Sequence, residues 1–373
     1  MRQKLLLTIF VLPYLFSPAF CEDQPVKIAA IFAKTGIAVS ENASYIPMIE
    51  LAVEELNSQG GLLGRPVELI VLDNQSTPIG STMAAQKAVQ QKVTVVIGAS
   101  WSSHSLAMAP ILQKAGIPMI SPSSTNPRVT LVGDCIFRVC FIDSKAGRVM
   151  ARFAYSDLGA RTAAVLKIIN EEYSLTLAEF FSKSFYQHGG KVVFDGSYTS
   201  KAVDFKELLK KVKSVRPDVV FVPGYSRDAG LLIRQAAAMG IQTKFLGGDG
   251  LNQISEFGGD AVEGSYYFSH WHPDIRSEPS MHLQKVYWEK FQKKLTATTA
   301  PLAYDAVMVL ADAIRRANSL DRSEIRKALS RTMAYKGATG SITFDANGDP
   351  RDKDVIIMVL GKKDHLYFKT MEP

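Results

Sequence analysis

The sequence predicts an α/β protein built from two doubly wound parallel sheets, each in its own lobe. Short, β-branched apolar runs such as Val93–Ile97 are typical of strands that are buried on both faces of a parallel sheet. Strand-like and helix-like segments alternate with short connections, which favours βαβ units. The alternation starts again after Asp143. A chain of 373 residues is long enough for two such cores.

Four strands are expected in the first part of the chain, with helices between them. Ile46, Ile49, Val53 and Leu56 recur at helical spacing and predict one apolar helix face, and Gly60-Gly61 ends that helix. The expected strands are 26–33, 68–73, 94–98 and one that begins at 118, and the expected helices are 45–57, 78–90 and a segment that follows Ser103.

The second run of alternating elements is followed by three helices and a different tail. The expected helices are 145–158, 174–188, 205–213 and 227–239, and the strands between them are 163–169, 192–198, 218–223 and 245–248. A β-rich stretch at 264–271 leads to helices at 279–295, 304–317 and 322–333, and then to strands at 340–344, 355–360 and 366–369. Helices that return late and a terminal hairpin indicate interleaved lobes, with a chain that crosses between them more than once.

The N-terminus has the pattern of a secretory signal peptide. Arg2 and Lys4 precede the apolar run Leu5–Phe16, which is too short to span a bilayer. We therefore expect residues 1–21 to be removed, with cleavage near Ala19 or Cys21, and an extracytoplasmic, periplasmic protein. Lipid anchoring at Cys21 is the less favoured alternative, because a bulky phenylalanine precedes this cysteine.

Composition and charge argue against a nucleic-acid partner. The formal net charge is +7, and removal of residues 1–21 leaves +5, but the basic residues are scattered along the chain. The two other cysteines, Cys135 and Cys140, are five residues apart. A continuous strand would hold them too far apart for a disulfide, whereas a turn would permit one, and the sequence leaves this open.

The sequence shows no motif that would make the chain an enzyme. It contains no G-x-S-x-G elbow, no P-loop and no G-x-G-x-x-G after a strand. Ser102 and Ser103 stand beside His104 at a helix start, where adjacent residues point in different directions, so they do not form a catalytic dyad, and we expect His104 to be exposed. His270 and His272 have no further ligand at zinc spacing and are expected at the surface or between lobes. No metal and no cofactor are predicted.

Polar and aromatic side chains follow several expected strands, at the edge of a parallel sheet where ligands bind. Hydroxyls and a helix N-terminus suit a carboxylate, whereas a carboxylate, phenols and aromatic faces suit an ammonium group. An α-amino acid carries both charges and would use both halves of the chain. The candidates are Ser102, Ser123 and Thr125 with Trp101 in the first half, and Tyr173, Tyr225 and Asp249 in the second.

Nearly all of the mature chain resembles the leucine/isoleucine/valine-binding protein family, the periplasmic amino-acid receptors of ABC importers. The segments that carry the resemblance are Glu50–Asn57 with Gly60–Arg65, Val95–Gly98, Gly116–Pro122, Phe137-Arg138 with Asp143, Gly224-Tyr225, and Phe344-Asp345 with Asn347–Asp349. The resemblance implies a type I periplasmic binding fold, with two lobes joined by three crossovers. It places residues 22–143 and 273–340 in the first lobe, and residues 144–272 and 341–373 in the second.

The resemblance also implies roles for the candidate residues. Ser102, Ser123 and Thr125 match the lobe that holds the ligand carboxylate, and Asp249 matches the acid that takes the α-ammonium. Tyr173 and Tyr225 match tyrosines of the second lobe. Glu41 stands where the branched-chain binders carry an aromatic lining residue, and Trp101 flanks the carboxylate site. A polar, cationic or aromatic ligand is therefore as consistent with the chain as an aliphatic one, and a solvated rim position for Glu41 stays open.

The function that the resemblance implies is capture of an amino acid, or a similar small carboxylate, and its delivery to the membrane permease subunits of an ABC importer. The expected protein is a monomer that closes on its ligand and makes or breaks no bond. The alternative is a periplasmic sensor or regulator of the same fold that binds an amide or another small solute.

Overall fold

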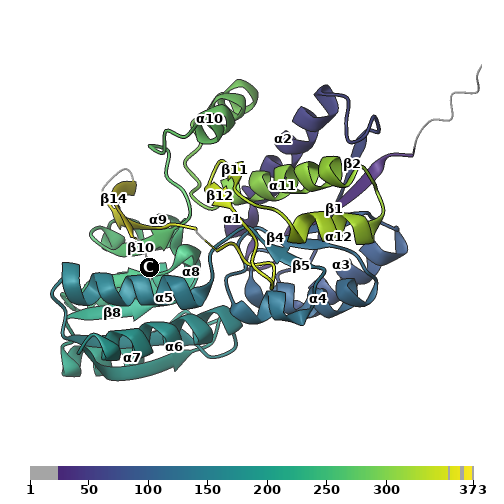
Figure 1. The fold of residues 1–373 in the computed structure, drawn as a ribbon. Helices are drawn as coiled ribbons and strands as arrows, with labels where there is room; N and C mark the ends of the chain where they lie inside the picture. The colour runs from purple at the N-terminus through teal and green to yellow at the C-terminus, as the bar shows by residue number, and fades with distance from the viewer. Residues whose placement is uncertain (1–23, 352, 362–364, 372–373) are drawn as a thin grey trace, which may run out of the picture.

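The computed structural model describes residues 24–351, 353–361 and 365–371, and it contains two open sheets with helices packed on them (Figure 1). The expected signal peptide, residues 1–21, lies outside the described residues. The helices and sheets of the two lobes lie side by side, and the chain passes between them near β4, β5 and β12 (Figure 1).

The first sheet has five parallel strands in the order β2-β1-β3-β4-β5. Along β1, Ile28 and Ala30 belong to one apolar cluster, whereas Ala29 and Ile31 belong to the cluster on the opposite face. Burial on both faces explains why nearly every residue of this strand is apolar. The strands are β1 (Val26–Phe32), β2 (Val67–Asp73), β3 (Val95–Gly98), β4 (Met119–Ser121) and β5 (Ile136–Arg138).

Helices cover both faces of this sheet. The helices α3 (Pro78–Gln90) and α4 (Ser102–Lys114) pack on one face, and α2 (Tyr45–Ser58) and α11 (Pro301–Ala317) pack together on the other. The outer helices α10 (Glu278–Phe291) and α12 (Arg322–Ser330) contribute to the apolar cluster that contains α2 and α11. The remaining helices are the short α1 (Val39–Asn42) and the 3-10 helix η1 (Pro127–Val132).

The second sheet has seven strands in the order β14-β13-β10-β9-β8-β6-β7. Five of them are parallel, and the C-terminal hairpin of β13 and β14 extends the sheet in antiparallel fashion from β10. The strands are β6 (Thr162–Ile168), β7 (Lys191–Tyr198), β8 (Val219–Val222), β9 (Lys244–Gly247), β10 (Tyr266–Ser269), β13 (Val355–Leu360) and β14 (His365–Met371).

The helices of the second lobe surround one large apolar cluster. They are α5 (Asp143–Arg152), which continues as the π-helix η2 (Phe153–Asp157), α6 (Glu172–Gln187), α7 (Lys206–Val215), α8 (Ser226–Ala238) and α9 (Ser255–Gly258), with the 3-10 helices η3 (Asp249–Leu251) and η4 (Gly259–Val262). The predicted α/β class with two doubly wound sheets is thus confirmed.

The chain crosses between the lobes three times. It passes from β5 to the second lobe at α5, returns after β10 to α10, and crosses again between the small hairpin β11 (Tyr335–Gly337) and β12 (Gly340–Ile342) and strand β13. The last crossing comes later than expected. Phe344 packs in the first-lobe core, and Asp349 forms an ion pair with Arg138 of β5 at 2.6 Å. Residues 341–350, which we assigned to the second lobe, therefore pack against the first.

The fold also bears on the state of the two cysteines and on membrane-spanning helices. Cys135 and Cys140 are both buried and free, because the intervening strand β5 extends the chain between them. Among the described residues, no helix combines the length and the apolar character that a membrane span requires.

Candidate functional site

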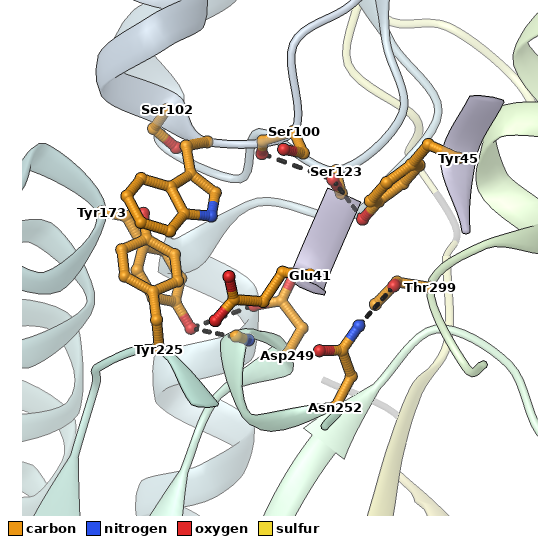
Figure 2. Close-up of a pocket in the computed structure, with 12 residues that line it drawn as sticks. Glu41, Tyr45, Ser100, Ser102, Ser123, Tyr173, Tyr225, Asp249, Asn252 and Thr299 are labelled. Atoms are coloured by element: carbon orange, nitrogen blue, oxygen red, sulfur yellow. Dashed lines mark hydrogen bonds between the residues drawn. The ribbon is translucent and has the colours of Figure 1, made fainter. Parts of the chain in front are cut away.

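A cavity between the lobes lies where the strand order of each sheet reverses. The reversal falls between β1 and β3 in the first sheet and between β6 and β8 in the second. Loops that leave such strands diverge and open a crevice at the carboxyl ends, where ligands of α/β proteins bind. The cavity encloses about 370 Å³, including its opening to solvent. It is lined by Glu41, Tyr45, Ser100, Trp101, Ser102, Ser123, Tyr173, Tyr225, Asp249, Gly250, Asn252 and Thr299 (Figure 2).

Hydroxyl groups dominate the edge that the first lobe contributes. Ser102 is the first residue of α4, so the unpaired N–H groups of a helix N-terminus lie beside its hydroxyl. Ser123 follows β4, and its hydroxyl donates to the carbonyl oxygen of Ser100 at 3.3 Å and accepts from the Tyr45 hydroxyl at 2.8 Å. These hydroxyls and the N–H groups at the start of α4 form an uncharged edge (Figure 2).

A single carboxylate, that of Asp249, dominates the edge of the second lobe. Asp249 begins η3 directly after β9. Its Oδ1 accepts a hydrogen bond from the Tyr173 hydroxyl at 3.0 Å, and its Oδ2 lies 2.9 Å from Nε2 of His270. Burial lowers the pKa of His270, so its neutral form is favoured. Gly248 permits this arrangement, because a Cβ there would lie 2.1 Å from the Tyr173 hydroxyl.

An aromatic stack joins the two lobes beside the cavity. The rings of Trp101, from the first lobe, and Tyr225, from the second, are stacked with centroids 3.8 Å apart and planes at 9°. Tyr173 packs against Tyr225 at 5.4 Å. Next to the stack, Ser103 donates across the cleft to Glu171 at 2.9 Å. The structure therefore has its lobes in direct contact, in a closed arrangement.

Glu41 places a second carboxylate in the cavity. It belongs to α1 in the loop after β1, and only 5% of it is exposed. Neither of its carboxylate oxygens has a hydrogen-bond partner among the described residues. Burial and the nearby negative charge of Asp228 raise the pKa of Glu41 to about 8.

Comparison with known proteins agrees with this geometry. Residues 25–364 match the model of a periplasmic binding protein family. The chain belongs to this family. It is 30% identical to Leu/Ile/Val-binding protein homolog 1 of Brucella abortus, over 87% of the chain and 88% of that relative.

Two solved structures of the family extend the comparison. The leucine-binding protein LivK of Thermotoga maritima has 36% sequence identity and a TM-score of 0.88, over 93% of this chain and 99% of that one. LivJ of Streptococcus pneumoniae, solved in complex with isoleucine, has 27% identity and a TM-score of 0.88, over 94% and 100%. The two-lobed type I fold of these periplasmic binding proteins is therefore the fold of this chain.

Seven of the eight candidate residues lie together on the cavity of this periplasmic binding protein. They are Glu41, Trp101, Ser102, Ser123, Tyr173, Tyr225 and Asp249. Thr125 does not line the cavity. It is buried two residues after Ser123, and its carbonyl oxygen accepts from the N–H of Asp143 at 2.9 Å. The rim position considered for Glu41 is wrong, because Glu41 is enclosed.

Other residues of the cavity were not anticipated. Tyr45 opens the helix α2, and Ser100 directly precedes Trp101, so both stood close to the candidates in the sequence. The Asn252 side chain donates to the Thr299 hydroxyl at 2.8 Å. Thr299 lies between α10 and α11, and nothing in the local sequence pattern marks it as a neighbour of η3.

One histidine differs from expectation, and two others do not lie at the surface. His104 is buried rather than exposed, and its Nδ1 lies 3.3 Å from the side-chain nitrogen of Asn74. His270 and His272 are also buried, and His270 supports Asp249 from behind the cavity wall. Within the described part of the chain, no group of three or more histidines, cysteines and carboxylates is placed to bind a metal.

Proposed function

We propose that this chain is the extracytoplasmic solute-binding protein of an ABC importer and that it captures an α-amino acid between its lobes. The observation that carries the proposal is the meeting of two unlike edges in one cavity. The first lobe presents hydroxyls and a helix N-terminus, and the second presents the carboxylate of Asp249. Relatives named for leucine, isoleucine and valine, one of them solved with isoleucine, support this class of ligand.

The hydroxyl edge is suited to the ligand carboxylate. Ser102 offers an O–H group, and Ser123 would offer one when its hydroxyl rotates from the Ser100 carbonyl toward the ligand. The first turn of α4 offers backbone N–H groups and the positive end of the helix dipole. Hydrogen bonds to a charged acceptor are about twice as strong as those between neutral groups. A carboxylate at this edge thus gains several charge-assisted hydrogen bonds without a cationic side chain.

The Asp249 edge is suited to the α-ammonium group. Its two partners, Tyr173 and His270, fix the carboxylate in place before a ligand arrives. Because His270 is favoured in its neutral form, it orients Asp249 without cancelling its charge. A ligand ammonium would neutralise this buried acid, and because Tyr173 and His270 satisfy its other lone pairs, the ion pair can repay the cost of its desolvation.

Ligand binding would stabilise the closed form. The two halves of the binding site belong to different lobes, so only the closed protein contacts both ends of an amino acid. The Trp101–Tyr225 stack and the hydrogen bond from Ser103 to Glu171 form across the same cleft. Permease subunits in the inner membrane would then recognise the closed monomer, and no bond of the ligand is made or broken. Export through the N-terminal signal, with cleavage near Ala19 or Cys21, places the mature protein in the periplasm.

A thermal-shift screen of the mature protein against the amino acids and small carboxylates tests the proposal. A ligand that binds only the folded protein adds about 2.7 kcal/mol of stability at a hundredfold excess over its dissociation constant. For a protein of this size we expect a rise in Tm of roughly 5 °C. A response to amides with none to any amino acid would instead favour the sensor alternative, and no response at all would refute the ligand class.

A further inference from the structure

Glu41 is a buried acid without a hydrogen-bond partner among the residues that the structure describes. Its side chain points into the cavity between Ser100, Tyr225 and Asn252 (Figure 2). The backbone N–H groups of Glu41 itself and of Ser226, at the start of α8, lie close enough to offset part of the rise of its pKa, but their geometry falls short of a full hydrogen bond to the carboxylate. Burial of a polar group without a partner is costly, so the arrangement calls for a donor from outside the chain.

The surroundings of Glu41 increase the demand for a positive charge. Among the described residues that line the cavity, none is lysine, arginine or histidine. Asp249 is a second lining acid, and Asp228 and Glu256 lie close enough to raise the pKa of Glu41 further. The side-chain oxygen of Asn252 is another buried acceptor without a partner among the described residues. The cavity therefore holds a surplus of acceptors and of acidic groups.

The α-carboxylate and α-ammonium groups of an amino acid do not satisfy these additional acceptors. In the proposed function the ligand carboxylate meets Ser102 and Ser123, and the α-ammonium meets Asp249. Glu41 comes from α1, on a different element from both sets, and is left for the ligand side chain. An aliphatic side chain would bury the carboxylate still further without a hydrogen bond, whereas a cationic side chain would pair with it.

Aromatic rings supply apolar surface beside Glu41. Trp101 and Tyr225 line the same cavity as Glu41, and because their faces are covered by the stack with His104 and Tyr173, they present their edges to a ligand. A long side chain with a terminal cation would bury its methylene groups against these rings and place its charge at Glu41.

We propose that Glu41 determines the specificity of this protein and selects an α-amino acid with a cationic side chain, in the class of lysine, ornithine and arginine. This inference rests on the proposed function, because it assigns the two ends of the ligand as above. It differs from the branched-chain ligands named for the relatives.

Matched ligand pairs test the inference on the unaltered protein. Isothermal titration calorimetry of the mature chain would compare arginine with citrulline, which has nearly the same shape but no charge, and lysine with norleucine. We expect the cationic member of at least one pair to bind ten times more tightly or better, which corresponds to about 1.4 kcal/mol. Equal or tighter binding of both neutral members would overturn the role of Glu41 while leaving amino-acid capture intact. Binding of no amino acid would refute the proposed function itself.

Two variants separate direct recognition from general electrostatics. Glu41→Gln keeps the size of the side chain and removes its charge, and we expect it to reduce the ratio of cationic to neutral affinity to less than threefold. Glu256→Gln removes the same charge from an exposed position on α9 and should leave the ratio at its original value. An unchanged ratio in Glu41→Gln, or an equal fall in both variants, would contradict direct contact between Glu41 and the ligand side chain.

Discussion

Two buried acids, Asp249 and Glu41, face the same cavity from opposite lobes and differ in how the protein supports them. Asp249 accepts a hydrogen bond from Tyr173 and contacts His270. Glu41 has no hydrogen-bond partner for either oxygen among the described residues. Both acids are nearly enclosed, so burial alone does not distinguish them.

The difference indicates two kinds of recognition. A carboxylate held by two side chains is already oriented, so a ligand that meets it loses little free energy to rearrangement. Such a group suits the α-ammonium, which every amino acid carries. An acid without hydrogen-bond partners has a raised pKa and stays protonated until a ligand supplies a partner. It therefore disfavours ligands that carry no such group. Asp249 would thus set the class of ligand, and Glu41 would select within the class.

The largest effect is expected from Asp249→Asn. The amide has the same shape but cannot neutralise the α-ammonium, and loss of one member of a buried ion pair costs about 3–5 kcal/mol. We expect the dissociation constant for the best amino acid to rise at least a hundredfold in titration calorimetry.

Asp195→Asn is the control for this change. Asp195 is half exposed on β7, where it pairs with Lys167, and it should not affect binding. A loss of less than tenfold in Asp249→Asn would mean that the ammonium lies elsewhere.

The next largest effect is expected from Glu41→Gln and concerns the pH dependence of stability. Its pKa in the folded protein, about 8, lies above its usual value of 4.5. The stability associated with this proton is complete below about pH 4.5 and is lost as the pH rises toward 8, at up to about 1.4 kcal/mol per pH unit. Glu41→Gln should remove this slope, so that the variant becomes the more stable protein at pH 8 in thermal denaturation.

The effect of Glu41 is measured as a difference between the wild type and Glu41→Gln, because other buried acids also contribute to the pH dependence of stability. Burial raises the pKa of Glu171 to about 7 and that of Asp228 to about 6, and both groups are present in the variant. Their own contributions therefore largely cancel in the difference between wild type and Glu41→Gln, which leaves Glu41 and its interaction with Asp228. Parallel stability curves for the two proteins between pH 5 and 8 would show that Glu41 is solvated in the unliganded protein.

Much of the site could be predicted because it follows from local order in the sequence. Parallel strands bring their carboxyl ends to one edge, so polar residues just after strands, such as Ser102, Ser123 and Asp249, were expected to converge. Periodicity located the strands, and the restart of the alternation located the second edge. The family resemblance then associated Glu41 with the same cavity.

The remaining features depend on long-range packing that no local pattern encodes. Thr299 reaches the cavity only because the chain returns to the first lobe after β10, and His270 supports Asp249 from the end of the neighbouring strand. Thr125 is not among the lining residues of the cavity, and its backbone carbonyl bonds to Asp143 instead. The late third crossing reflects the ion pair between Asp349 and Arg138, which holds residues 341–350 on the first lobe.

A moderate effect is expected from Trp101→Leu. The change keeps an apolar side chain but removes the stack with Tyr225, and such stacks contribute about 0.5–1.5 kcal/mol. Because the stack forms between lobes, its loss should weaken closure and raise the dissociation constant roughly two- to tenfold. Trp288→Leu, at a half-exposed position on α10, is the control. An equal change in both variants, or none in Trp101→Leu, would argue against a role for the stack in closure.

The smallest effect distinguishes the two hydroxyls that follow β4. Ser123 lines the cavity and Thr125 does not. Ser123→Ala removes one hydrogen-bond donor to the ligand carboxylate, which corresponds to about 0.5–1.5 kcal/mol and a roughly three- to tenfold weaker affinity. Thr125→Val keeps the shape of a buried side chain and removes only its hydroxyl, so the affinity should stay within twofold. Titration of both variants with the same amino acid compares the two losses of affinity.

If Thr125→Val weakens binding more than Ser123→Ala does, the ligand carboxylate lies nearer to Thr125 than to Ser123, deeper in the first lobe than we propose. The ammonium would then also shift relative to Asp249, and the division of roles between the two acids would have to be assigned again.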